Sequence, residues 1–234
     1  MFPDPLLMKP IVSCFCALFL ASSPSLLAVD VRFLAWDQDI AARQVAVADG
    51  EKQTEIKNLH PLQRTEAIKT TAAEGIVSVR SLDKKSPEGK ALELQVKIGG
   101  NMSKPLILLL PDSKAPTGLR GFAIEDDSTS FPWGSFRVLN ATGKAMQMGF
   151  GAQRKQLPAG WQPVDVKPEG NKAAPVWFAA PGNPKTPLYS AVWKPDPDIR
   201  RLVIVVPGTE ARLGPLALKV IPEDRKSLAS VEKP

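Results

Sequence analysis

Short apolar runs separated by turn residues recur along the chain from about residue 30 onwards. They are rich in Val, Ile, Leu and aromatic residues and begin roughly 10–15 residues apart, which is typical of the antiparallel strands of a β-sandwich. In the first half the expected strands read VRFLAW, QVAVAD, GIVSVRSL, ALELQVKI, PLILLLP and LRGFAI. In the second half they read FRVLNA, AMQMGF, QPVDV, VWFAA, LYSAVW, RLVIVVP and LALKVI.

Two of these runs, residues 106–110 (LILLL) and 202–206 (LVIVV), do not alternate between apolar and polar residues. A strand with one solvated face alternates, so a continuous apolar run predicts a central strand that is buried on both faces. The side chains expected to be inaccessible are Leu108, Leu110, Ile204 and Val206.

The same two runs belong to a longer internal match between residues 106–118 and 202–214, at an offset of 96. The identical pairs are Leu106 and Leu202, Pro111 and Pro207, Ala115 and Ala211, and Gly118 and Gly214. Two unrelated strands ending in proline would explain the apolar runs but not the matching Ala and Gly. The sequence therefore predicts an all-β protein of two tandem Ig-like antiparallel β-sandwich domains, produced by an internal duplication.

Four segments follow from this organisation. We expect a signal peptide over residues 1–28, a first β-sandwich domain over 29–128, a second over 129–226 and a flexible tail over 227–234. The domain boundary is placed in the polar, acidic segment Glu125–Ser130. This connection is short, so the two domains are expected to touch rather than move independently.

The signal peptide is predicted from the order of residue types near the N-terminus. Lys9 precedes an uncharged run, Ile11–Ala21, and small residues then lead to Ala28. This order is typical of a secretory signal, with cleavage expected between Ala28 and Val29. The apolar run is too short to span a bilayer as a helix. We therefore expect export to the periplasm or cell surface, with no transmembrane segment in the mature chain.

Composition limits the chemistry available to the mature chain. The two cysteines, Cys14 and Cys16, lie in the predicted signal peptide, and His60 is the single histidine. These counts exclude a disulfide framework and a multi-histidine metal site, and no cofactor is expected. Because 44% of the residues are hydrophobic, packing alone can supply a core.

Charge and aromatic residues are unevenly divided between the predicted domains. Residues 29–128 hold 14 Lys and Arg against 15 Asp and Glu, a net charge of −1. Residues 129–234 hold 15 against 8, a net charge of +7, and nine of the mature chain's twelve aromatic residues. Basic groups attract anions and flat aromatic rings stack on sugars. We therefore expect the second domain to contact an anionic or glycan envelope polymer, or an envelope protein.

Four residues are candidates for this contact. Trp161 lies in a turn bounded by proline and glycine (LPAGWQP) and is expected to be exposed. Trp193 aligns with Lys97 of the first domain and is expected to point outward, and Arg154 and Lys155 form a basic pair. The alternative for each tryptophan is that it fills the core of the second domain. Nucleic acid is not an expected partner, because the basic residues are dispersed and the chain is exported.

No catalytic signature accompanies these features. His60 precedes a proline in a loop-like stretch, and no nucleophile motif matches it. Paired acids occur in turn-like stretches, at Asp37 and Asp39, Asp126 and Asp127, and Asp196 and Asp198, and are interpreted as turn residues. The expected function is a non-enzymatic binding or assembly module of the cell envelope. The alternatives are a purely structural envelope subunit that binds another protein, and a glycoside hydrolase that uses turn carboxylates such as Asp196 and Asp198.

Overall fold

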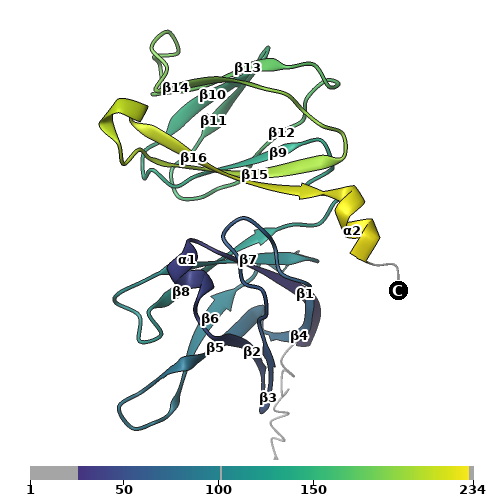
Figure 1. Cartoon of the computed structure of the whole chain (residues 1–234), viewed down its shortest axis with the longest axis vertical. Helices are drawn as coiled ribbons and strands as arrows, with labels where there is room; N and C mark the ends of the chain where they lie inside the picture. The colour runs from purple at the N-terminus through teal and green to yellow at the C-terminus, as the bar shows by residue number, and fades with distance from the viewer. Residues whose placement is uncertain (1–25, 101, 232–234) are drawn as a thin grey trace, which may run out of the picture.

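The computed structural model describes residues 26–100 and 102–231 and has two halves stacked one above the other (Figure 1). Strands make up 51% of the chain and helices 5%, so the protein is all-β. The sheets pack in a sandwich-like manner, as the sequence predicts. No helix among the described residues is long and apolar enough to cross a membrane.

The first half, drawn in purple to teal in Figure 1, contains one eight-stranded sheet in the order β3-β2-β5-β4-β1-β7-β8, with β6 paired to β5. Its elements are β1 (Leu26–Ala35), α1 (Gln38–Ala41), β2 (Val45–Asp49), β3 (Lys52–Glu55), β4 (Ile68–Ala73), β5 (Ile76–Lys85), β6 (Ala91–Lys97), β7 (Pro105–Pro111) and β8 (Leu119–Glu125). Strand β1 pairs antiparallel with β4 as far as Val31 and parallel with β7 from Arg32 onwards.

The second half contains two four-stranded sheets, in the orders β11-β10-β13-β14 and β12-β9-β15-β16. Its elements are β9 (Phe136–Asn140), β10 (Met146–Phe150), β11 (Gln153–Leu157), β12 (Val164–Val166), β13 (Ala174–Ala179), β14 (Tyr189–Trp193), β15 (Ile199–Pro207), the short 3₁₀ helix Ala211–Leu213, β16 (Leu216–Asp224) and α2 (Arg225–Val231). The predicted boundary between residues 128 and 129 falls in the connection from β8 to β9.

The two halves follow one strand-pairing scheme. β1 pairs parallel with β7 and antiparallel with β4, and β9 pairs parallel with β15 and antiparallel with β12. The pairs β7-β8, β2-β3, β2-β5 and β5-β6 recur as β15-β16, β10-β11, β10-β13 and β13-β14. Leu106 lies between Arg32 and Ile124, and Leu202 lies in the same way between Arg137 and Ile221.

All of the strands expected from the apolar runs are present. No apolar run marks β3, β4 or β11, and β4 lies within Leu62–Glu74, a stretch that the sequence leaves open as strand or loop. β3 and β11 are edge strands of mainly exposed polar residues, so no apolar run marks them.

The two uninterrupted apolar runs form central strands buried on both faces, as predicted. In β7, Ile107 and Leu109 pack in the core of the first half, while Leu106, Leu108 and Leu110 face the second half. In β15, Val203 and Val205 pack in the core of the second half, and Leu202 and Ile204 face the first. The expected burial is wrong only for Val206, which is half-buried near the end of its strand.

A third core therefore joins the halves. Its buried residues are Leu34, Leu106, Leu108, Leu110, Ile124, Phe131, Leu139, Leu202, Ile204 and Ile221. Because β7 and β15 each contribute one face to this core, separating the halves would expose continuous apolar surface. The expectation that the two predicted domains touch is confirmed.

A buried ion network lies beside this third core and corrects the interpretation of Asp126 as a turn acid. Asp126 is 2% exposed and binds the guanidinium groups of Arg32 and Arg64, both from the first half. Arg200 and Glu223 of the second half pair with each other at 2.5 Å, and Glu223 also binds Arg32. The segment expected to be a polar, acidic linker is therefore fixed at Asp126 by charges from both halves.

The network controls the ionisation of its members. Burial alone would raise the pKa of Asp126, but Arg64, Arg32 and Arg200 together lower it below its usual value. Burial opposes the charge of Arg64 as well, and the nearby carboxylates of Asp126 and Glu223 outweigh it and raise the pKa of Arg64.

The end of the chain, where a flexible tail is predicted over residues 227–234, is helical as far as Val231, and residues 232–234 lie outside the described residues. Helix α2 begins at Arg225, and the amide of Lys226 donates to the carboxylate of Asp224 at 2.8 Å. A side-chain acceptor at this place satisfies one of the free amides of the first turn. The side chains of Arg225 and Lys226 also pair with Asp198.

The predicted signal peptide lies outside the described residues as far as residue 25. Residues 26–28 belong to β1, where Ala28 pairs with Thr71 and Val29 with Thr70. Cleavage between Ala28 and Val29 would remove three residues of this strand, and it remains a prediction.

Candidate functional site

The two tryptophans singled out in the sequence are half-buried, and each packs against other aromatic rings. Trp161 is half-buried between the halves, with its ring centre 5.8 Å from that of Trp36 and 5.5 Å from that of Phe122. Its turn faces the other half, so the expected exposure is wrong. Trp193 packs its ring against Phe136 and Phe178, at 5.1 and 6.1 Å.

The outward direction expected for Trp193 is wrong because of the register of β14. Along this strand Tyr189, Ala191 and Trp193 are half-buried, whereas Ser190 and Val192 are exposed. Successive side chains of a strand point to opposite faces, so a one-residue difference in alignment reverses the face. Trp193 thus occupies an inward position, unlike the exposed Lys97.

Arg154 and Lys155 are both exposed on the edge strand β11, but they do not act as a pair. Arg154 is opposite Gly149 and Lys155 is opposite the fully buried Met148, so the two side chains leave opposite faces of the sheet. Arg154 contacts the ring of Trp177. The four predicted partner-binding residues therefore do not form one surface.

The edges of the two sandwiches differ. In the first half β6 packs directly against β8, and a Cβ on Gly121 would lie 2.4 Å from a methyl group of Val96. In the shared pairing scheme Leu218 takes the place of Gly121. The corresponding strands of the second half, β14 and β16, do not close in this way, and a groove lies between them.

The groove has a volume of about 260 Å³ and an aromatic and aliphatic floor. Its lining residues are Phe136, Val192, Trp193, Lys194, Arg201, Val203 and Val220. The rings of Phe136 and Trp193 lie side by side, and Val192 and Val220 on its rim are 70% and 39% exposed. Of the four predicted partner-binding residues, Trp193 alone is among the residues that line this groove.

Two cations face this floor, and neither forms an ion pair with a described residue. The guanidinium of Arg201 lies 5.5 Å from the ring centre of Phe136, and its Nη1 is buried without a hydrogen-bond partner among the described residues. Lys194 is exposed and pairs with no described carboxylate. No acidic residue lines the groove, so the arrangement can hold an anion beside an apolar surface.

Sequence reasoning missed Arg201 and Lys194. The signal for Arg201 lay in the alternation of β15, where Arg201 shares a face with the buried Val203 and Val205. A cation at an inward position of a strand either has a buried partner or marks an opening. Here it marks the groove.

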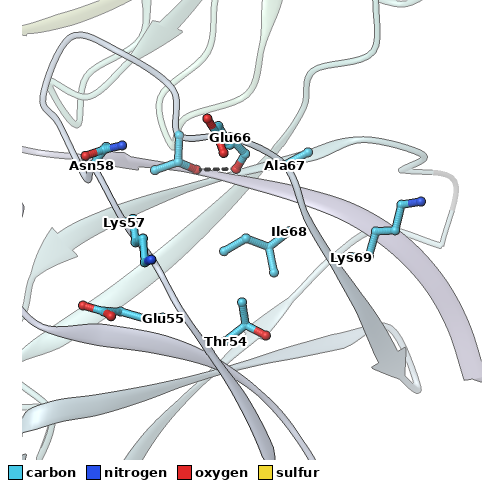
Figure 2. A pocket seen from close by; sticks show the side chains of 9 residues that line it. Thr54, Glu55, Lys57, Asn58, Glu66, Ala67, Ile68 and Lys69 are labelled. Atoms are coloured by element: carbon cyan, nitrogen blue, oxygen red, sulfur yellow. Dashed lines mark hydrogen bonds between the residues drawn. The ribbon is translucent and has the colours of Figure 1, made fainter. Parts of the chain in front are cut away.

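A second hollow, of about 340 Å³, lies in the first half between the segment that follows β3 and the start of β4 (Figure 2). Its walls carry charges of both signs, Glu55 and Glu66 beside Lys57 and Lys69, and its hydrophobic lining residues, Ala67 and Ile68, are aliphatic. The side chains that line it are mostly exposed. Its lining mixes acids and bases and includes no aromatic side chain, so we place the candidate site in the groove.

The remaining candidates from the sequence have local structural partners. His60 accepts a hydrogen bond from the amide of Leu62 at 3.0 Å. Asp37 caps helix α1, Asp196 accepts from the amide of Asp198, and Asp127 accepts from the amide of Thr129. The described residues contain no group of three or more His, Cys, Asp and Glu side chains placed to hold a metal ion.

Comparison of the sequence with models of known protein families and with curated proteins gives no match. The site's own geometry is therefore the basis for the function proposed below.

Proposed function

We propose that the chain is an exported, non-enzymatic binding module of the cell envelope, and that the groove of its second half binds a glycan that carries carboxylate groups. One observation carries this proposal: Arg201 and Lys194 lie beside the aromatic floor formed by Phe136 and Trp193, with no counter-ion in the part of the chain that the structure describes.

An acidic sugar fits both parts of the groove. A buried N–H without a partner is costly, and a carboxylate would give Nη1 of Arg201 a charge-assisted hydrogen bond. The C–H face of a sugar ring would pack on the indole of Trp193, whose ring lies beside that of Phe136. Lys194, on the exposed side, would attract the charge from solution.

We also propose that the two halves are Ig-like sandwiches related by duplication and that they have divided their roles. The shared pairing scheme and the equivalent positions of Leu106 and Leu202 support a common origin. The packing of Gly121 against Val96 closes the first sandwich, and the groove leaves the second open. The first half would then act as a scaffold for the second.

The test uses polygalacturonate and its fully methyl-esterified form, which share one backbone and differ in charge. Isothermal titration of the mature protein should detect binding of the acidic polymer only, weakening with salt as screening shortens to about 8 Å at physiological ionic strength. Arg201→Gln should weaken binding about 10- to 100-fold, the value of a buried charge-assisted hydrogen bond.

Lys172→Gln is the matched control, because Lys172 is an exposed loop lysine of the second half outside the groove. It removes the same charge and should change the affinity by less than about threefold. Equal losses in the two variants, or equal binding of the neutral polymer, would contradict a carboxylate site at Arg201.

A protein partner is the second candidate, favoured by one observation. Six large hydrophobic side chains are exposed among the described residues, and four of them lie on or next to β14 and β16: Leu188, Val192, Leu213 and Val220. Exposed apolar residues gathered at one edge are typical of a protein interface. Salt-independent capture of one envelope protein, lost in Val192→Asp, would favour this structural role over glycan binding.

A further inference from the structure

A row of four residues crosses the outer face of the sheet formed by β11, β10, β13 and β14. Arg154 is opposite Gly149, Gly149 is opposite Trp177, and Trp177 is opposite Ser190. Since side chains alternate along a strand, Trp177 points away from the core that its neighbours Val176 and Phe178 fill. This face is therefore separate from the groove, into which Trp193 points.

The indole of Trp177 occupies the space that a side chain at residue 149 would take. A Cβ at residue 149 would lie 2.3 Å from both Nε1 and Cε2 of Trp177, so any side chain larger than hydrogen would displace the indole. The indole thus lies across the bare backbone of β10 and is held by the sheet below it. Such a ring presents a fixed aromatic surface with little rotamer freedom left to lose on binding.

Arg154 stands next to this ring with its charge uncompensated. Its guanidinium lies 5.1 Å from the ring centre and donates from Nη1 to the carbonyls of Gly151 and Gln153, at 2.7 and 2.8 Å. No described carboxylate pairs with it. The indole N–H of Trp177 also has no hydrogen-bond partner among the described residues.

Two side-chain amides lie beside the row, on the same face of the sheet. Gln147 and Gln156 are opposite each other in β10 and β11, one step along the same face. Nε2 of Gln147 donates to the carbonyl of Ala180 at 2.9 Å, which fixes this side chain and leaves its carbonyl oxygen directed elsewhere. Side-chain amides are suited to sugar hydroxyls because they both donate and accept.

We propose that this face is a second binding site, for a single sugar ring bearing a carboxylate. The carboxylate binds the guanidinium of Arg154, the C–H face of the ring packs on the indole of Trp177, and the hydroxyls reach Gln147 and Gln156. The site uses no residue of the groove, so it does not rest on the function proposed above.

The experiment follows the indole N–H signals of the protein by ¹⁵N NMR during a titration with trigalacturonate. The signals are assigned with Trp177→Phe and Trp193→Phe, so that one signal reports the outer face and the other reports the groove. We expect the Trp177 signal to shift until it saturates. We expect Arg154→Gln to lower the affinity obtained from this shift about tenfold. Lys155→Gln removes the same charge from the neighbouring position on the opposite face. It should change the affinity reported by the Trp177 signal by less than about twofold.

Three outcomes would overturn the proposal. The first is an unchanged Trp177 signal at saturating ligand, which would mean that the indole only packs on the backbone at Gly149. The second is an equal shift with the methyl-esterified trimer, and the third is an equal effect of Lys155→Gln and Arg154→Gln. A shift of the Trp193 signal alone would support the groove and contradict the outer face, and a shift of the Trp177 signal alone would do the reverse.

Discussion

Arg64 and Asp126 form a two-pronged ion pair with both side chains buried, at 3% and 1% exposure. Nε of Arg64 donates to Oδ2 of Asp126 at 2.8 Å, and Nη2 donates to Oδ1 at 3.1 Å. Asp126 directly follows β8, the last strand of the first half. Through Arg32 and Glu223 the same network reaches the second half, so it links the relative position of the halves to the charge of one carboxylate.

Asp126→Asn should destabilise the protein severely. It removes the carboxylate that Arg32 and Arg64 bind and leaves Glu223 as the one remaining carboxylate of the described network. Removing one partner of a buried ion pair typically costs about 3–5 kcal/mol. Urea unfolding at neutral pH measures the loss. Asp127→Asn is the neighbouring control, since Asp127 is partly exposed and accepts mainly from Thr129, and its cost should be about 1 kcal/mol or less. Similar costs for both variants would show that the network adds no more stability than a turn.

Acid should weaken the same network. The folded-state pKa of Asp126 is lowered, so its contribution is complete above the unfolded value of about 3.9 and is lost as the pH falls through the folded value. The free energy of unfolding of the native protein should therefore decrease steeply below about pH 4. Asp126→Asn cannot lose this charge, so its dependence on pH over that range should be flatter. Parallel curves for the two proteins would assign the acid sensitivity to other carboxylates.

Ile204→Ala tests the core between the halves. Ile204 is fully buried there, and truncating such a side chain costs about 2–5 kcal/mol through lost burial and the cavity left behind. The comparison is Val192→Ala at an exposed position, which should stay within about 0.5 kcal/mol. Thermal unfolding of both variants gives the two values. A small effect at Ile204 would mean that the halves hold together without this core.

Gly121→Ala tests the closure of the first sandwich. The added methyl group would overlap Val96 and force β6 and β8 apart, at a cost of about 1–3 kcal/mol. Val96→Ala removes the opposing methyl groups, so the double variant should lose less stability than the two single variants added together. Strict additivity in this double-mutant cycle would place the two residues out of contact.

Export predicts a defined N-terminus. The intact mass of the protein recovered from the periplasm or medium should correspond to a chain that begins at Val29, after cleavage behind Ala28. Ala28→Arg should block processing, because signal peptidases require a small residue before the cleaved bond. A chain recovered in the cytosol with residues 1–28 retained would contradict the predicted signal.

Local patterning was enough to locate most of the strands. Each apolar run became a strand, because the alternation of side chains in an extended chain is a property of neighbouring residues. Continuous apolar runs also revealed that β7 and β15 are buried on both faces. The polar edge strands β3 and β11 left no such trace, since their stability comes from pairing with a neighbour rather than from burial.

Contacts between distant segments decided the rest. The sequence determined that the protein is all-β, that two strands are central and that the net positive charge and the aromatic residues are concentrated in the second half. Only the tertiary structure decided that Trp161 packs between the halves, that Trp193 points inward and that Asp126 is surrounded by arginines. Composition counts charges and rings but not their neighbours, and a register difference of one residue moves a side chain from the surface to the core. The groove at Arg201 and the face at Trp177 depend on such neighbours, so they became visible only in the folded chain.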